Sequence, residues 1–247
     1  MKAKDQLLGN YGIAAGSFAL YFVIVYSLII IIMSAYTVGI GAGNAADNLS
    51  SGWSIITQAL GIVIGIISML FAVGYVNIIR KIADGERPPV SELFYVFRNH
   101  PDKVIIISVI MMGAQFILML PAGFIASSVF ADGKDAAFDG KMFFWWVVAY
   151  LAGFLISVAI DLMISMSFMI YLDDPDAGVG EILTKSISMM KGNKLRLLYL
   201  SLSFIGYWVL LMLSLGIASL WIVPYQTMAT LEFYRDLRGQ YAEAEYL

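Results

Sequence analysis

Long unbroken runs of apolar residues constrain the fold of this 247-residue chain more than any other feature. A hydrocarbon core of about 30 Å needs roughly 20 helical residues, and each run meets that length. The runs lie at about residues 17–41, 55–79, 104–130, 142–171 and 195–234. The last is long enough for two helices, with a natural break at Leu215–Ile217. Charged residues make up only 13% of the chain, about half the share of soluble domains, so we expect an all-α, polytopic membrane helical bundle with six transmembrane helices.

The basic residues fall almost entirely on one side of these predicted helices. Cytoplasmic flanks of membrane proteins are enriched in Lys and Arg. Six spans with both termini inside place 13 of the 15 basic residues on the cytoplasmic side and leave Lys134 and Lys141 outside. Five spans would move Arg235 and Arg238 to the wrong side. We therefore expect three hairpins with an N-in/C-in orientation.

A short polar or amphipathic stretch precedes the first, third and fifth spans. The stretches are Asp5–Gly12, Val90–Lys103 and Val179–Lys194, and their predicted turn residues are Gly9, Asn10, Asn99, Gly192 and Asn193. The last two stretches carry apolar residues at helical spacing, which is typical of short helices lying in the cytoplasmic membrane interface. We expect a single membrane domain over residues 1–247, with hairpin units at about 1–81, 88–172 and 178–238. Triplication of one unit, or three similar hairpins of separate origin, would give this pattern.

Several segments carry a resemblance to a known family. They are GNYG at Gly9–Gly12, DPDAGVGEILTKSISMMKGNK at Asp174–Lys194, LSFIGYW at Leu202–Trp208, LGIASLWIVPY at Leu215–Tyr225 and EFYRDL at Glu232–Leu237. Together they resemble the bacterial membrane-protein family known as domain of unknown function 975, with Tyr11 where the family has Trp. The resemblance implies a multi-pass protein of the bacterial cytoplasmic (plasma) membrane. It also implies a distant likeness to the membrane domain of glycerophosphodiester phosphodiesterases, and it supplies no activity, ligand or catalytic residue.

Asp161 lies inside the fourth predicted span, about ten residues from its cytoplasmic end. An intramembrane carboxylate is costly and marks a candidate functional site. It belongs to an intramembrane polar stripe that recurs every fourth residue, formed by Gly153, Ser157, Asp161 and Ser165. The stripe could line a polar cavity or proton path. Alternatively, small residues let two helices pack there while Asp161 hydrogen-bonds a neighbour such as Gln115 or Gln58.

Charged residues gather at the predicted cytoplasmic ends of the spans. The basic ones could face anionic lipid headgroups, each near-surface charge contributing about 1 kcal/mol, or could simply record the topology. They are Arg80, Lys81, Arg87, Arg98, Lys103, Lys185, Lys191, Lys194 and Arg196. An acidic cluster, Asp173, Asp174 and Asp176, precedes the third interfacial helix. It could bind a cation weakly or complement the helix dipole.

The motifs of most enzyme classes are missing from the sequence. There is no cysteine, and His100 has no second histidine with which to hold a metal. No phosphate-binding loop, nucleophile elbow or dinucleotide fingerprint is present. We therefore expect a protein that is not an enzyme and has no cofactor or metal site.

Two functions fit these features best. The first is binding of membrane lipids or a membrane-protein partner, as a scaffold, assembly or resistance factor. The alternative is a small transporter or channel-like conduit that uses Asp161. A third hypothesis, an intramembrane enzyme that acts on lipid, is supported only by Asp161. No basic patch suggests a nucleic-acid partner, and the sequence leaves the oligomeric state open.

Overall fold

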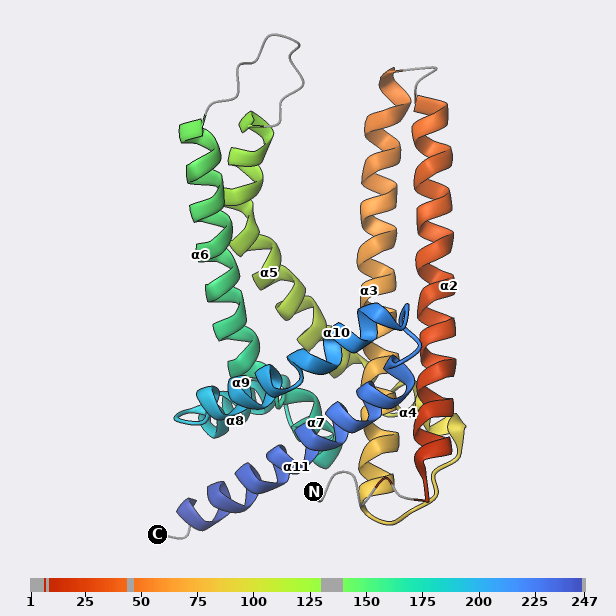
Figure 1. Ribbon diagram of the computed structural model, residues 1–247, viewed down its shortest axis with the longest axis vertical. Coiled ribbons are helices and arrows are strands. Elements are labelled where there is room, and N and C mark those ends of the chain that lie inside the picture. Colours follow the sequence, from red (N-terminus) through yellow and green to blue (C-terminus); the bar gives the residue numbers. More distant parts are fainter. Residues whose placement is uncertain (1–6, 8, 44–46, 130–139, 246–247) are drawn as a thin grey trace.

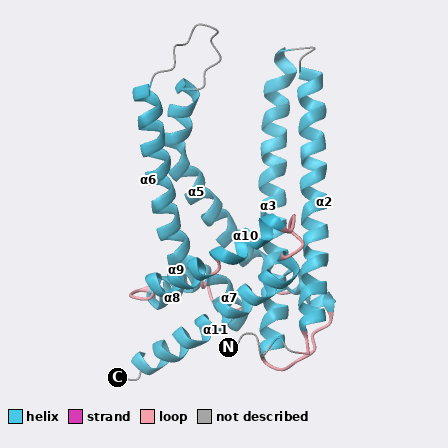
Figure 2. Cartoon of the chain, in the orientation of Figure 1, coloured by secondary structure: helices cyan, strands magenta, loops and turns pink. Residues whose placement is uncertain are grey.

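The computed structural model describes residues 7, 9–43, 47–129 and 140–245, and every regular element within these ranges is a helix (Figures 1 and 2). The all-helical class predicted from the apolar runs is therefore confirmed. The elements are α2 (Tyr11–Gly43), α3 (Asp47–Ala83), the 3-10 helix η1 (Val90–Phe94), α4 (Tyr95–Arg98), α5 (Pro101–Val129), α6 (Gly140–Ile164), α7 (Ser167–Asp173), α8 (Val179–Met190), α9 (Lys194–Ser203), α10 (Ile205–Leu213) and α11 (Ser219–Glu245).

The first two predicted hairpins are long and diverge from a common end (Figure 1). Helix α2 packs along α3, and α5 packs along α6. We use the term base for one end of the molecule, where α2 begins and where α3 and α7 both terminate. At the base, α3 and α5 come together, and the two hairpins separate away from it (Figure 1). Lys134, predicted to lie in an outer loop, falls outside the described residues.

The third hairpin lies obliquely across the other two, near the base (Figure 1). Its outgoing arm is interrupted at Phe204, which separates α9 from α10. Its turn lies where the sequence predicted a break, and there Leu215 and Gly216 take left-handed backbone angles, with φ of 51° and 90°. Glycine adopts such an angle at no steric cost, which explains its place in the turn.

Five helical segments in the described part of the chain are long and apolar enough to cross a membrane. They are Tyr11–Ala35, Ile55–Ala83, Pro101–Ser127, Gly140–Asp173 and Lys194–Leu213. The expected sixth, in α11, is not among them. Its apolar part is followed by Glu232, Arg235 and Asp236, so the uncharged stretch from Ser219 is shorter than the roughly 20 residues that a span needs. The chain is thus a helical protein with five candidate spans, and a sixth is not confirmed.

The two described interfacial stretches fold differently. The second forms η1 and the single turn α4, and Leu93 and Val96 bury their side chains in the core. The third forms one amphipathic helix, α8, which packs on α6 and α7. Its buried residues include Ile182, Met189 and Met190. In the first stretch, Asp5, Gln6 and Leu8 lie outside the described residues.

A left-handed residue beside an asparagine precedes each outgoing helix. Gly9 and Gly192, with φ of 90° and 88°, stand before Asn10 and Asn193. In the second unit the order is reversed, because His100, with φ of 48°, follows Asn99. The Asn99 and Asn193 side-chain amides each donate a hydrogen bond to the carbonyl four residues earlier, at 3.0 and 3.3 Å. The predicted turn residues therefore occupy three similar turns.

The buried core is concentrated at the base, where all three hairpins contribute. It contains Ile78 and Ile79 of α3, Ile107 of α5 and Met228 of α11, each fully buried. One close approach fixes this packing, because a Cβ added to Gly74 of α3 would lie 2.1 Å from the Leu93 carbonyl oxygen. Only glycine leaves room there for the backbone of η1. The base is therefore the part of the molecule that holds functional groups in fixed positions.

Candidate functional site

The polar stripe of α6 faces α5 as a packed seam. A Cβ added to Gly153 would lie 2.9 Å from the Leu118 carbonyl oxygen of α5, so the two backbones nearly touch. Farther along, Gln115 Nε2 of α5 donates a hydrogen bond to Asp161 Oδ2 at 2.9 Å. Of the two partners that the sequence suggested, the structure thus selects Gln115, and Gln58 lies exposed on α3.

The serines of the stripe make hydrogen bonds within their own turns. Ser157 donates to the Phe154 carbonyl at 2.8 Å, and Ser165 donates to the Leu162 carbonyl at 2.9 Å. Small residues are typical of a helix–helix packing surface in membranes because they let the two backbones approach closely. Of the two alternatives that the sequence left open for this stripe, the contacts of Gly153 and Asp161 with α5 fit the packing seam.

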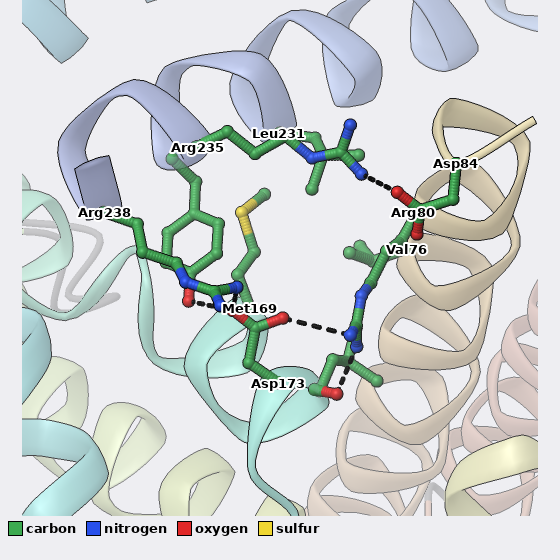
Figure 3. Close-up of a pocket in the computed structure, with 10 residues that line it drawn as sticks. Val76, Arg80, Asp84, Met169, Asp173, Leu231, Arg235 and Arg238 are labelled. Carbon is green, nitrogen blue, oxygen red and sulfur yellow. Dashed lines mark hydrogen bonds and ion pairs between the residues drawn. The ribbon is translucent and has the colours of Figure 1, made fainter.

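The charged groups of the three hairpins converge on Asp173 at the end of α7 (Figure 3). Arg80 of α3 approaches Oδ1 at 3.1 Å, and Arg238 of α11 donates to Oδ2 at 2.6 Å. The Tyr234 hydroxyl of α11 donates to the same Oδ2 at 2.7 Å. Arg80 also donates to the Leu172 carbonyl. One carboxylate thus links the returning arms of all three hairpins.

A second ion pair lies beside the first (Figure 3). Arg235 of α11 contacts Asp84, just past the end of α3, at 2.5 Å, and Glu232 on its own helix at 3.4 Å. Asp84 and Arg235 are partly exposed, whereas the Asp173 side chain is 18% exposed. Asp173 is thus the less exposed of the two carboxylates, and salt screens its ion pairs less than it screens the Asp84 pair.

These groups surround one cavity of about 160 Å³. We call it the base cavity. Its charged and polar walls are formed by Arg80, Asp84, Asp173, Tyr234, Arg235 and Arg238, and its apolar walls by Val76, Met169, Leu172 and Leu231 (Figure 3). A site that combines a polar rim with a few fixed charged groups in a concave surface is a candidate binding site.

The predicted basic residues do not form one uniform surface. Arg80 belongs to the base cavity, Lys81 pairs with Glu92 at 3.0 Å, and Lys103 donates to the Pro175 carbonyl at 2.6 Å. Arg196 pairs with Asp236 at 2.8 Å and lies over the Phe233 ring. The others vary in exposure: Arg87, Arg98, Lys185 and Lys191 are exposed, and Lys194 is half-buried.

The acidic cluster also divides into separate roles. Asp173 accepts the bonds described above, and Asp174 Oδ1 accepts hydrogen bonds from the backbone N–H groups of Asp176 and Ala177, both at 3.2 Å. Asp176 lies 3.4 Å from His100. Across the described ranges, no three His, Asp or Glu side chains form a group that could hold a metal ion.

The sequence pointed to Arg80 and Asp173 separately, as a basic flank and an acidic cluster, and did not indicate the rest of the base cavity. Arg235 and Arg238 served only as topology signals, and Tyr234 and Asp84 had no assigned role. The available signal was the Tyr-Arg-x-x-Arg pattern of the tail, which places three polar groups on neighbouring turns of one helix. That pattern does not reveal that Asp173, 61 and 65 residues earlier, would accept hydrogen bonds from Tyr234 and Arg238.

The fold defines a class: a helical membrane protein with at least five candidate spans, whose three hairpins are joined at one end. The chain belongs to the family described as protein of unknown function (DUF975), which matches residues 1–241. This match confirms the family that the sequence motifs suggested. No curated protein and no solved structure matches the chain.

Proposed function

We propose that this chain is a non-enzymatic, multi-pass protein of the bacterial cytoplasmic membrane that binds lipids or partner membrane proteins, as a scaffold, assembly or resistance factor. In this proposal α11 makes the sixth crossing, because a bilayer thins locally around a span that is shorter than its hydrocarbon core, and the base faces the cytoplasm. That orientation keeps Arg235 and Arg238 on the same side as Arg80, as the positive-inside rule favours.

One observation carries the proposal: the hairpins are joined at the base and open beyond it. Large apolar side chains of α2 and α5 are exposed away from the base, including Ile31 at 60%, Phe116 at 68% and Phe124 at 73%. In a membrane these surfaces face lipid chains or the helices of a partner. Open apolar flanks on a fixed base suit a protein whose role is to hold other molecules.

The packed α5–α6 seam favours binding over conduction. A proton or ion path needs polar groups that face water, whereas Asp161 is bonded to Gln115 and Gly153 contacts the backbone of α5. The distant likeness to the membrane domain of glycerophosphodiester phosphodiesterases rests on sequence resemblance alone. It supports a membrane location and adds no reaction.

Extraction from native membranes tests the proposal directly. The full chain would be crosslinked in its own membrane, extracted with its surrounding lipid in a polymer disc, and analysed by mass spectrometry. We expect a stoichiometric lipid or a protein partner. Recovery of neither would overturn the proposal.

A flux measurement tests the competing function. Proteoliposomes with the native chain and with Asp161→Asn would be compared for proton and ion flux. We expect no flux above protein-free vesicles for either protein. A flux that the native chain supports and Asp161→Asn abolishes would establish the conduit instead.

A further inference from the structure

We propose that the base cavity binds a phosphate group, held by the guanidinium groups of Arg80, Arg235 and Arg238. This inference rests on the proposed binding function and gives it a site and a ligand chemistry. The phosphate could belong to a lipid headgroup or to a small soluble molecule, since the same oxygens are recognised in both cases.

The three arginines reach the cavity from two different hairpins. Arg80 comes from the last turns of α3, and Arg235 and Arg238 come from the C-terminal half of α11 (Figure 3). Their separation along the sequence means that the cavity exists only when the third hairpin is docked. A guanidinium presents five N–H donors in a planar fork that matches the oxygens of phosphate.

The charge of the lining favours an anion. Three arginines and two aspartates, Asp84 and Asp173, line the cavity, which leaves one positive charge in excess. Asp173 is engaged by three donors, so its charge is already largely compensated. Within the lining a phosphate meets one positive charge in excess, and the carboxylates that oppose it at Arg235 are Asp84 and Glu232, which does not line the cavity but lies 3.4 Å from Arg235.

The size and exposure of the groups also suit an exchangeable ligand. A water needs only about 10–15 Å³ of such a cavity, so 160 Å³ has room for several waters or one phosphate group. The Arg238 side chain is 63% exposed, and Arg235 is 33% exposed. Both can turn toward an incoming anion without disturbing the buried core.

The location of the cavity agrees with this chemistry. It lies at the base, beside the ends of α3 and α7, where two candidate spans end at Ala83 and Asp173. In the orientation that we propose, this is the depth of the lipid phosphates on the cytoplasmic side. Basic groups at that depth attract anionic lipid headgroups.

The test uses the purified full chain in nonionic detergent and two probes. The first is inorganic phosphate at constant ionic strength, and the second is phosphatidic acid added to the micelles. Because a ligand that binds the folded state raises the unfolding midpoint, an apparent Kd follows from the midpoint at each probe concentration. We expect at least one probe to raise the midpoint of the native chain in a saturable way.

Three variants separate a phosphate site from a structural ion-pair network. Arg238→Gln should weaken binding about tenfold, the loss expected for one charge-assisted hydrogen bond. Asp84→Asn should tighten binding, because it removes one of the two carboxylates that oppose the phosphate at Arg235 and leaves Arg235 paired with Glu232 alone. A purely structural network predicts lower stability for both variants and no opposite changes in affinity. Arg98→Gln, at an exposed position of the same end, is the matched control and should change binding less than about twofold.

The outcomes show whether the phosphate group comes from a lipid or from a soluble molecule, and which results would contradict the inference. Equal binding of both probes assigns the site to the phosphate group itself, and binding of phosphatidic acid alone assigns it to a lipid headgroup. The inference is wrong if neither probe binds, if Arg98→Gln weakens binding as much as Arg238→Gln, or if Asp84→Asn weakens it. Extraction from native membranes tests the proposed function independently of this site. If a partner is recovered but neither probe binds, only the phosphate site is wrong. If a probe binds but no partner is recovered, the result counts against the proposed function.

Discussion

The two ends of α3 have the same apolar character and opposite surroundings. Toward the base, Ile78 and Ile79 are fully buried by the other hairpins. Toward the far end, Ile55 and Ile62 are 68% and 53% exposed. In a membrane, exposure of an apolar side chain carries no hydrophobic cost, because lipid chains are as apolar as leucine. The difference shows that the base is distinguished from the far end by how tightly its side chains are packed, since hydropathy is similar at both ends.

Matched truncations on this helix test the comparison most strongly. Ile78→Ala leaves a cavity in the base and should lower the free energy of unfolding by about 3 kcal/mol. Ile62→Ala removes the same atoms from an exposed site and should cost less than about 1 kcal/mol. Thermal or denaturant unfolding in detergent measures both. Equal losses would mean that the far end is as tightly packed as the base.

Two glycines of α3, one packed and one open, give a second pair of matched substitutions. A Cβ at Gly74 would lie 2.1 Å from the backbone oxygen of Leu93, so Gly74→Ala should destabilise the chain by about 2 kcal/mol. Gly61 has nothing within 4 Å of such a Cβ, and Gly61→Ala should be neutral or stabilise by up to about 1 kcal/mol through helix propensity. The yield of monodisperse protein and its unfolding midpoint report both effects. A harmless Gly74→Ala would contradict the close contact between α3 and η1.

The Asp173 junction can be broken without removing volume. Asp173→Asn leaves Arg80 and Arg238 without their carboxylate and should cost about 1–2 kcal/mol, less at high salt, because the pair is partly exposed. Asp176→Asn, at a side chain that is 91% exposed, is the control and should stay within about 0.5 kcal/mol. Unfolding at two salt concentrations separates the charge effect. A loss that salt does not change would show that Asp173 acts through shape rather than charge.

The smallest effect is expected inside the α5–α6 seam. Asp161→Asn retains an acceptor for Gln115 and should change the free energy of unfolding by less than about 1 kcal/mol, in line with hydrogen bonds between membrane helices. The same unfolding assay measures it. A loss above about 2 kcal/mol would mean that the Asp161 side chain has a further partner besides Gln115.

Part of the fold could be read from the sequence because apolar run length is a local property. The first four spans, the break near Gly216 and the turns at Gly9 and Gly192 depend on residues close together in the chain. The oblique third hairpin could not be predicted in this way. Its direction depends on contacts of α11 with α2, α3 and α8, which no local pattern encodes.

The candidate sites show the same limit. Periodicity put Gly153 and Asp161 on one face of α6 and left Gln115 and Gln58 open as partners, and the hydrogen bond of Gln115 to Asp161 appears only in the structure. The base cavity needed the tertiary structure, because Arg80, Asp173 and Arg238 come from three different hairpins. Each of these residues also has an ordinary local explanation, as a topology signal or a helix cap, so no sequence pattern indicated that they form one group.

The sequence by itself determined that this chain is a helical membrane protein, since runs of about 20 apolar residues can satisfy their backbone hydrogen bonds in lipid only as helices or within a closed barrel, and their length selects helices. Its motifs also determined the family, which the match over residues 1–241 confirms. Only the tertiary structure decided where the chain is packed and where it is open. Burial and ion pairing depend on which segments meet, and at Asp173 three distant segments meet on one carboxylate.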